Sequence, residues 1–391
     1  MSAPENPSVV IVGPSPHFTS GISTYTIRLA NALAKTGASV GVISYRRILP
    51  RFLFPGRRRV GKHITSLQFD PAIEVVGSVD YHNPFSWARA ARFLRKTKPD
   101  LVLFQWWSAT VAHMHLYLAR VAKRLGCKVA FEMHETLDPF EDSVAPIRLY
   151  ARAVTNRLMP KGDLFVVHSQ ADAEAVAHRF GVRPDRIVPV AHGMYDHFGA
   201  AARDVSRRKL GLNSDEFVFL AFGLIRAYKG IPDLIEAFGS IPSDFATRVR
   251  LLVVGEVWED GERIQQVLER NPHKDRIQVI RRYIPDDEVG THFSAADALV
   301  LPYTRASQSG VAHIAMSYGL PILGTRVGGL SEALAKYPGA RTIPPLDQGA
   351  LARALMELVQ QKPAVRLRAP RDDGWTEAAR AVLSLARPPA S

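Results

Sequence analysis

The fold is decided by a stretch in the second half of the chain, Phe217-Val-Phe-Leu-Ala-Phe-Gly223-Leu-Ile-Arg226-Ala-Tyr-Lys229-Gly230. A short apolar run ends here at a glycine, and two cations follow within six residues. An apolar run of this length, bounded by turn residues, predicts a buried strand of a parallel sheet. The cations then lie just beyond the carboxyl end of that strand, where open α/β sheets bind their ligands.

The same alternation of short apolar runs and helical patterns extends over the whole chain. In the first half the apolar runs lie at residues 9–13, 40–44, 73–77, 101–106, 129–134, 164–169 and 187–192. In the second half they lie at residues 217–223, 249–255, 277–283, 298–303, 321–325 and 342–344. Parallel strands joined by right-handed crossovers give this alternation. We therefore predict an α/β protein with two doubly wound, Rossmann-like domains that face a central cleft.

The boundary between the domains is predicted where the alternation resets, near residue 200. The stretch 199–209 is polar and has no strand signal, so we interpret it as a linker. The predicted divisions are an N-terminal domain over residues 1–198, a C-terminal domain over residues 199–370 and a helix over residues 371–391. The spacing of the last segment predicts that this helix packs back towards the N-terminal domain. At 391 residues the chain exceeds what one hydrophobic core ordinarily supports.

Composition narrows the class of protein. With 47% hydrophobic and 22% charged residues the chain is typical of globular proteins, and no segment is apolar and long enough to cross a bilayer. The single cysteine, Cys127, excludes an internal disulfide framework and is expected to be buried just before a strand. The polar N-terminus lacks the regions of a signal peptide. We therefore expect a cytoplasmic protein.

The net charge of +13 indicates an anionic partner: nucleic acid, phospholipid or a phosphorylated substrate. Seven basic side chains fall within residues 46–62, interleaved with Leu49, Phe52, Leu53 and Phe54 and without an acidic residue. This pattern predicts contact with an anionic membrane surface, so that the protein lies at the inner face of the cell membrane. A solvated basic loop is the alternative. We expect no nucleic-acid partner, because no recognised binding motif is present.

Two further turns have the features of phosphate-binding sites. Gly21 opens a helix after the first predicted strand and permits close approach of the backbone. Ser309, Gly310 and Val311 open another helix and would present backbone amides to anionic oxygens. A purely structural turn remains the alternative for each when it is taken alone.

The segment with Arg226 and Lys229 adds charge to these amides. Arg226 can bind two phosphate oxygens at once, and Lys229 can add a point charge, so the pair could neutralise a diphosphate. Two solvated basic residues in a loop are the alternative.

Taken together, these segments resemble the family 4 glycosyltransferases, and the resemblance spans nearly the whole chain. The residues that carry it are Gly21, His134-Glu135, His192-Gly193, the Arg226–Gly230 segment, Gly255-Glu256, Tyr283-Ile-Pro285, Asp297, Ser307-Gln-Ser-Gly310 and Gly328-Gly329. The resemblance implies a GT-B fold, with an acceptor-binding domain over residues 1–198 and a nucleotide-sugar-binding domain over residues 199–370. It also implies a transferase of the EC 2.4 type that retains the configuration of the donor's anomeric carbon without a bound metal or other cofactor.

The resemblance also assigns roles to residues. It implies that His134, Arg226 and Lys229 are catalytic. The donor-binding residues that it implies are Gly21, Gly223, Arg226, Lys229, Gly255, Glu256, Tyr283, Ile284, Pro285, Ser309, Gly310 and Val311. For His134, a strand-end histidine that bonds a backbone carbonyl is the alternative.

One departure from the family pattern concerns the turn before the helix at Gly310. Many members carry two glutamates separated by seven residues there, whereas this chain has Ala306 or Ser307 and Ile314. The chain thus looks like a branch with Ser-Gln-Ser-Gly in place of the glutamate pair, and the departure leaves the donor sugar open.

The resulting functional hypothesis is transfer of a sugar from a nucleoside-diphosphate donor to an acceptor hydroxyl. The acceptor is expected to be a lipid-linked or growing saccharide in envelope or exopolysaccharide assembly. Alternatives are another GT-B enzyme, such as a nucleotide-sugar epimerase or a phosphorylase, and a non-enzymatic anion-binding protein. A dinucleotide-dependent oxidoreductase shares the architecture, but its glycine fingerprint is missing here.

Overall fold

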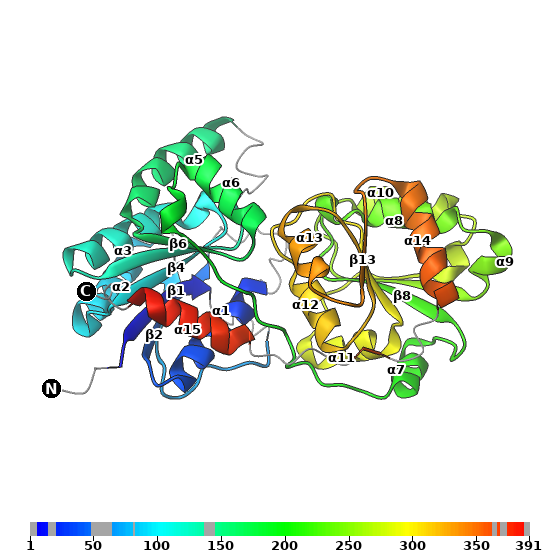
Figure 1. The fold of residues 1–391 in the computed structure, drawn as a ribbon, viewed down its shortest axis with the longest axis horizontal. Helices are drawn as coiled ribbons and strands as arrows, with labels where there is room; N and C mark the ends of the chain where they lie inside the picture. Colours follow the sequence, from blue (N-terminus) through cyan, green and yellow to red (C-terminus); the bar gives the residue numbers. More distant parts are fainter. Residues whose placement is uncertain are drawn as a thin grey trace. The chain divides into compact units, whose positions relative to one another are not determined.

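The computed structural model describes residues 6–14, 21–47, 65–80, 83–136, 145–361, 366–367 and 374–386. The chain forms two compact units: unit 1, with Met1–Gly193 and Asp373–Ser391, and unit 2, with Met194–Asp372. Each unit is a parallel sheet flanked by helices, which confirms the predicted fold class (Figure 1). Most of the basic segment 46–62, and the side chains of Arg46 and Arg47, fall outside the described residues.

The described strands are all parallel, and each corresponds to one predicted apolar run. Unit 1 has a seven-stranded sheet of order β3-β2-β1-β4-β5-β6-β7, with bounds β1 Ser8–Pro14, β2 Ser39–Arg47, β3 Glu74–Asp80, β4 Leu101–Trp106, β5 Lys128–Met133, β6 Leu164–Val167 and β7 Ile187–Pro189. Unit 2 has a six-stranded sheet of order β10-β9-β8-β11-β12-β13, with bounds β8 Phe217–Phe222, β9 Val249–Val254, β10 Ile277–Ile280, β11 Ala298–Leu301, β12 Ile322–Thr325 and β13 Ala340–Ile343. In both units the strand order reverses direction beside the first strand, as in dinucleotide-binding folds.

Most of the helices lie between successive strands of one sheet and form the crossovers. Those of unit 1 are α1 Gly21–Lys35, α2 Pro84–Thr97, α3 Ala112–Arg124, α5 Ala145–Leu158, α6 Gln170–Phe180 and α15 Gly374–Ala386. Those of unit 2 are α7 Arg203–Leu210, α8 Ile231–Gly239, α9 Ser243–Ala246, α10 Gly261–Arg270, α11 Asp286–Ala295, α12 Gly310–Ser317, α13 Gly328–Ala335 and α14 Gln348–Gln361.

The helices of unit 1 lie on both faces of its sheet. α1 leads from β1 towards one edge and α3 leads from β4 towards the other, so right-handed crossovers place them on opposite faces. α15 packs on α1 and β1, and α2 and α5 pack on α3 (Figure 1). The indole of Trp375 in α15 lies over Gly193, where a Cβ atom would come within 2.4 Å of the ring. The last described helix of the chain therefore completes the core of unit 1.

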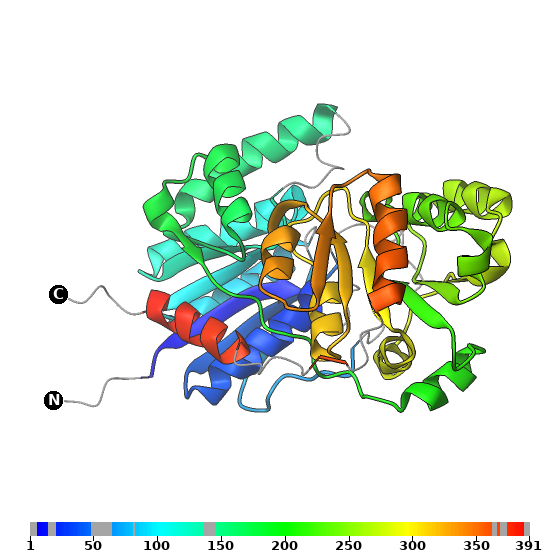
Figure 2. The ribbon, with the colours of Figure 1, turned by 45° about the vertical axis from the view of Figure 1, so that its right-hand side comes forward.

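The core of unit 2 lies between its sheet and the helices α8, α10 and α14. α14 runs beside α8 on this face (Figure 2). Buried apolar side chains of β8 and β9, such as Phe219 and Leu251, meet Phe238 and Leu355 from the helices. The apolar residues from which β8 and β9 were predicted therefore lie in this core. Cys127 of unit 1 is buried directly before β5, which confirms that prediction.

The predicted linker over residues 199–209 is wrong, because part of it is a helix packed into unit 2. Arg207 in α7 is 1% exposed, and its guanidinium donates to the carbonyls of Ala295, Asn213 and Glu216 and to the carboxylate of Asp297. A buried arginine with this many acceptors holds a polar helix in place without an apolar stripe.

The boundary between the units also differs from the prediction. Unit 1 ends at Gly193, so residues 194–198 belong to unit 2 rather than to the N-terminal domain. The carbonyl of Tyr195 accepts a hydrogen bond from Ser317, and the carbonyl of Phe198 accepts one from Tyr318. These bonds tie the segment to the end of α12.

Candidate functional site

The residues expected to bind a nucleotide-sugar in unit 2 lie at one edge of its sheet. Segments 223–230, 255–256 and 302–311 follow the carboxyl ends of β8, β9 and β11. In the strand order β10-β9-β8-β11, the connection after β8 leads to one side and the connection after β11 to the other. The two loops therefore diverge, and open α/β sheets bind ligands in the crevice that such loops leave.

Lys229 places a buried charge at this edge. The residue is 9% exposed and ends the 3-10 helix η5 (Ala227–Lys229). Its Nζ lies 5.3 Å from the centroid of the Tyr303 ring, and within the described part of the chain it makes no hydrogen bond or ion pair. Burial lowers the pKa of Lys229 below its usual 10.5. A buried cation without a counter-ion is costly, so this position favours an anionic ligand.

Arg226 is held in place by an acidic residue that the sequence pattern did not single out. Its guanidinium donates to Oε1 of Glu259 at 3.0 Å, while Oε2 of the same carboxylate accepts the amide of Ala227 at 3.0 Å. Partial burial raises the pKa of Glu259, but these bonds outweigh it and keep the pKa below its usual value. Glu259 thus fixes the turn that carries both predicted cations.

A third cation, Arg305, lies at the same edge in the loop after β11. Its guanidinium carbon is 5.0 Å from the centroid of the Tyr228 ring, and that of Arg226 is 5.9 Å from the same ring. One aromatic ring is thus shared by cations from the two loops. Arg305 is not among the residues predicted from the sequence, although it lies within the stretch between β11 and Gly310.

Glycines allow these loops to approach each other. A Cβ atom on Gly223, whose φ is +106°, would lie 3.0 Å from Nζ of Lys229 and 3.2 Å from Cγ2 of Val311. A Cβ atom on Gly255 would lie only 1.8 Å from the carbonyl oxygen of Gly223. Gly223 therefore leaves room for the lysine side chain, whereas Gly255 is required by close packing of two backbones.

The start of α12 presents the backbone amides of a helix terminus. Ser309 is the N-cap, and its hydroxyl accepts the amide of Ala312 at 3.3 Å. The amides of Gly310 and Val311 in the first turn have no acceptor within the helix. The ring of Tyr195 packs on Gly310, where a Cβ atom would lie 2.9 Å from it. An anion at this terminus would meet two amides and the positive end of the helix dipole.

The remaining predicted donor residues lie further along the edge. The carbonyl of Glu256 accepts the amide of Ile225 at 2.9 Å, and its carboxylate accepts the indole N–H of Trp258 at 2.7 Å. Tyr283, Ile284 and Pro285 follow β10, two strands away from β8, and Ile284 is 6% exposed. The side chain of Ile284 therefore belongs to the core, and only its backbone could meet a ligand.

In unit 1, His134 follows β5 directly, and its amide bonds the carbonyl of Trp106 at 2.8 Å. The imidazole is 9% exposed, and its Nε2 lies 3.7 Å from Oε2 of Glu132, a fully buried carboxylate in β5. Burial lowers the pKa of His134 well below its usual value and raises that of Glu132. Gly21 is the first residue of α1, and in the described part of the chain no atom outside its own helix and chain neighbours lies within 4 Å of where its Cβ would be.

Several other polar side chains converge on the same carboxylate. Tyr25 donates to Oε1 at 2.7 Å, Gln105 donates to Oε2 at 3.3 Å, and Nε2 of His168 lies 4.0 Å from Oε1. Thr26 in turn bonds the side-chain oxygen of Gln105. We call Tyr25, Gln105, Glu132, His134 and His168 the Glu132 cluster. Its sequence signal is weak: single polar residues, Gln105 and Glu132, near the carboxyl ends of otherwise apolar strands.

Glu132, His134 and His168 bring potential ligand atoms within 4.8 Å of one another, close enough for a metal ion. Both carboxylate oxygens already accept a hydrogen bond from Tyr25 or Gln105. The carboxylate is 0% exposed and the two imidazole side chains are 9% and 0% exposed, so all three groups are withdrawn from solvent. The raised pKa of Glu132 and the lowered pKa of His134 both favour the uncharged forms of these two groups.

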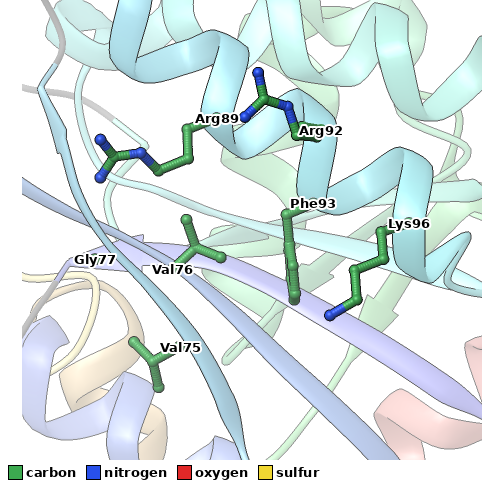
Figure 3. Close-up of a pocket in the computed structure, with 7 residues that line it drawn as sticks. All are labelled: Val75, Val76, Gly77, Arg89, Arg92, Phe93 and Lys96. Atoms are coloured by element: carbon green, nitrogen blue, oxygen red, sulfur yellow. The ribbon is translucent and has the colours of Figure 1, made fainter.

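A basic pocket lies elsewhere in unit 1, between the edge strand β3 and α2 (Figure 3). It has a volume of about 360 Å³, and its floor is formed by Val76 and Phe93. Arg89, Arg92 and Lys96 project from α2 around it (Figure 3). None of the predicted catalytic or donor residues lines this pocket.

Two family models match the chain. The model described as "Glycosyltransferase Family 4" matches residues 19–196, and the model described as "Glycosyl transferases group 1" matches residues 216–361. A D-inositol 3-phosphate glycosyltransferase 1 from Catenulispora acidiphila is 25% identical, over 94% of this chain and 90% of its own length.

Solved structures with the same fold cover nearly the whole chain. A sucrose-phosphate synthase from Thermosynechococcus elongatus matches with a TM-score of 0.68 and 19% identity, over 97% of this chain and 96% of its own. HepE from Anabaena in complex with UDP and glucose matches with a TM-score of 0.66 and 17% identity, over 97% of this chain and 95% of its own. Among the described helices, none has the length and apolar character needed to cross a membrane.

Proposed function

We propose, from the premise that this chain belongs to the glycosyltransferases of GT-B fold, that it moves a sugar from a nucleoside-diphosphate donor to an acceptor hydroxyl. The observation that carries this proposal is Lys229. Its ammonium group is buried, stands at the diverging loops of unit 2, and has no counter-ion among the described residues. A diphosphate would supply the missing negative charge.

The proposed donor site combines three kinds of positive group. Lys229 and Arg226 would neutralise the diphosphate, and the amides of Gly310 and Val311 would bind its oxygens at the start of α12. By the family resemblance, the backbone around Tyr283 and Pro285 would lie by the nucleotide base. These residues of the protein would do the work that a metal ion does in other transferases, so we propose that no metal is required.

In the proposed reaction the acceptor hydroxyl attacks the anomeric carbon on the face from which the diphosphate leaves. The bond from that carbon to the diphosphate breaks, the bond to the acceptor oxygen forms, and a leaving-group oxygen takes the hydroxyl proton. Configuration is thereby retained. Charge develops on the departing diphosphate in the transition state, so Lys229 and Arg226 would accelerate the chemical step by stabilising it there. His134 of unit 1 would contact the donor sugar, and Gly21 would let α1 approach the phosphates.

Unit 1 is proposed to bind a saccharide or lipid-linked acceptor at an anionic membrane surface, in envelope or exopolysaccharide assembly. The net charge of +13 and the basic segment 46–62 support this. Arg89, Arg92 and Lys96 around the pocket on α2, with Phe85 89% exposed at the start of that helix, provide a second basic and apolar region in the same unit. Such a protein would act from the cytoplasmic face, as a peripheral protein.

The proposal is tested by thermal unfolding of the protein against UDP, GDP, ADP, CMP, NAD and a short oligonucleotide. A ligand that binds only the folded state raises the melting temperature. At 100 times its Kd, it increases the free energy of unfolding by about 2.7 kcal/mol. We expect one nucleoside diphosphate to stabilise the protein selectively, and the Lys229→Ala variant to lose that response. Stabilisation by NAD or by the oligonucleotide alone would overturn the proposal.

A further inference from the structure

We propose that Tyr228 and Tyr303 are positioning residues of the donor site: their rings hold three cations at the carboxyl edge of the sheet in unit 2. The cations are those of Arg226, Lys229 and Arg305. The use of these cations to bind a diphosphate rests on the proposed function. The attraction between the rings and the cations does not, so the two can be tested separately.

The two rings are fixed relative to each other, because the loops after β8 and β11 are joined near the strand ends. The amide of Thr304 donates to the carbonyl of Tyr228 at 2.8 Å. Gly230 has a φ of +63°, and a Cβ atom on it would lie 2.1 Å from the carbonyl oxygen of Pro302. The ring centroids of Tyr228 and Tyr303 are 5.8 Å apart, with an angle of 82° between the ring planes. Aromatic pairs favour this edge-to-face arrangement.

The ring of Tyr303 attracts the ammonium group of Lys229. Nζ lies 5.3 Å from the ring centroid, within the range over which a ring face attracts a cation. Both residues line a small cavity of about 10 Å³ whose other lining residues, such as Val254 and Leu301, are apolar. The attraction is stronger in apolar surroundings than in water. The ring therefore offsets part of the cost of burying the ammonium group.

The hydroxyl group of Tyr303 stays neutral. The residue is 3% exposed, and burial raises its pKa to about 12. The hydroxyl of Ser309, the N-cap of α12, lies close enough to lower this pKa, although not in hydrogen-bond geometry. Lys229 is therefore attracted by a ring face and not by a phenolate. The same tyrosine approaches both the lysine and the residue that caps α12.

The ring of Tyr228 lies beside two cations. The guanidinium carbons of Arg305 and Arg226 are 5.0 Å and 5.9 Å from its centroid. Two like charges at one ring repel each other, and Glu259, which bonds Arg226, carries a single negative charge. The electron-rich face of the ring offsets part of this repulsion.

Holding the cations in place should increase the affinity for an anion. Lysine and arginine side chains lose much conformational freedom when a ligand fixes them. Side chains that a ring already holds lose less of it when the ligand binds. Tyr228→Leu and Tyr303→Leu keep every cation but remove a ring. We therefore expect weaker binding of an anion in these variants, although the charge of the site is unchanged.

The first test measures the pKa of Lys229 by NMR of lysine labelled with ¹³C at Cε. The Lys229 signal is identified by its absence in Lys229→Arg. Besides burial, Tyr228 raises and Arg226 lowers the pKa of this lysine. We expect Tyr303→Leu to lower this pKa further by about one unit, which is a tenfold weaker proton affinity, and Tyr303→Phe to leave it unchanged. An unchanged pKa in Tyr303→Leu would overturn the proposal for this ring.

Two controls accompany this titration. Lys336 is exposed, so its pKa should be the same in all the variants. Tyr337→Leu removes another buried tyrosine of unit 2, which is 5% exposed, and should leave the pKa of Lys229 unchanged. A pKa of Lys229 that falls equally in Tyr303→Leu and Tyr337→Leu would show a general loosening of unit 2 and contradict the positioning role.

The second test measures the binding of inorganic pyrophosphate by calorimetry. Tyr228 is only half-buried, so this test remains available if Tyr303→Leu does not fold. We expect Tyr228→Leu to raise the Kd for pyrophosphate by about three- to tenfold, and Tyr228→Phe, which keeps the ring, to raise it by less than about twofold.

Equal Kd values in wild type and Tyr228→Leu would overturn the proposal for this ring. So would equal losses of affinity in Tyr228→Leu and Tyr228→Phe, because the hydroxyl and not the ring would then act. If pyrophosphate does not bind to the wild-type protein at all, the proposed function fails, while the pKa of Lys229 still decides whether the ring of Tyr303 holds the lysine.

Discussion

The side chain of Lys229 is nine-tenths buried beside the ring of Tyr303. Its positive charge is unfavourable there until an anion binds next to it. Since the charge on the diphosphate increases as the sugar bond breaks, Lys229 should stabilise the transition state more than the bound donor. We therefore predict that Lys229→Ala lowers kcat by about 10²–10³-fold, the usual effect of removing one such group, with a smaller rise in KM.

Steady-state kinetics with the selected donor test this prediction. Lys336→Ala is a suitable control, because Lys336 is an exposed cation of unit 2 that lies outside the proposed donor site. Equal kcat values in wild type and Lys229→Ala would contradict the assigned role.

The burial of Lys229 also predicts a pH dependence of nucleotide binding. In the protein without a bound nucleotide, burial lowers the pKa of Lys229 below 10.5. Lys229 therefore loses its charge at a lower pH than an exposed lysine does. The anion binds the protonated form, so affinity for the selected nucleoside diphosphate should fall as the pH rises through this lowered pKa. Calorimetric titration between pH 7 and pH 10 would measure it. In Lys229→Arg, which stays charged, the fall should disappear; a fall of equal size in that variant would point to another group.

The candidate site could be predicted from sequence only in part. Arg226, Lys229 and Gly310 were predicted because they follow apolar runs and glycines in a local pattern. Glu259 and the members of the Glu132 cluster other than His134 could not be found this way, because their partners come from segments far apart in the chain. Glu132 meets Tyr25 across 107 positions and Gln105 across 27. Only the strand order of the sheet brings such residues together.

At the scale of single elements, α7 depends on one side chain. The guanidinium of Arg207 bonds four backbone carbonyls, those of Asn213, Ser214, Glu216 and Ala295, and the carboxylate of Asp297, and the helix has few apolar residues to bury. Arg207→Ala would leave Asp297 and these carbonyls without their partner. We predict a loss of about 3–5 kcal/mol in the free energy of unfolding.

Urea denaturation followed by circular dichroism would measure this loss. Arg208→Ala provides a matched control, because Arg208 is the next residue of the same helix and is exposed. It should change the free energy of unfolding by no more than about 0.5 kcal/mol. Similar losses in the two variants would show that α7 is not held by Arg207.

The elements themselves were predictable to different degrees. All the predicted strands are present, because buried parallel strands are continuous apolar runs, here of three to seven residues. Their ends were less certain: the run at residues 187–192 gives β7 only as far as Pro189. α7 was mistaken for a linker, since its sequence Arg-Asp-Val-Ser-Arg-Arg-Lys-Leu lacks an apolar stripe. A helix held by a buried ion pair has no periodic signal to detect.

At the scale of the whole molecule, the chain leaves unit 1 at Gly193 and returns to it at Asp373. The returning helix α15 places Trp375, 7% exposed, against Gly193 and the rings of Tyr25 and His192. We predict that Trp375→Ala leaves a cavity there and lowers the free energy of unfolding by about 3–5 kcal/mol.

Trp375→Ala should also weaken the packing of the aromatic rings around His134. Two measurements therefore test it. Urea denaturation gives the loss of stability, and the ¹⁵N imidazole signals of His168 and His192 should shift or broaden. Arg380→Ala, at an exposed position of the same helix, should do neither. A stable Trp375→Ala protein with unchanged imidazole signals would show that α15 is not part of the core of unit 1.

The return of α15 has a consequence for how the protein is made. A ribosome delivers the seven strands of unit 1 first, then the whole of unit 2, and only afterwards the helix that covers Gly193 and Tyr25. The apolar surface of nascent unit 1 that α15 covers therefore stays exposed while unit 2 is synthesised and folds. Chaperones bind such surfaces, and aggregation begins at them. Slow translation through unit 2 would lengthen that exposure, and fast translation would shorten it.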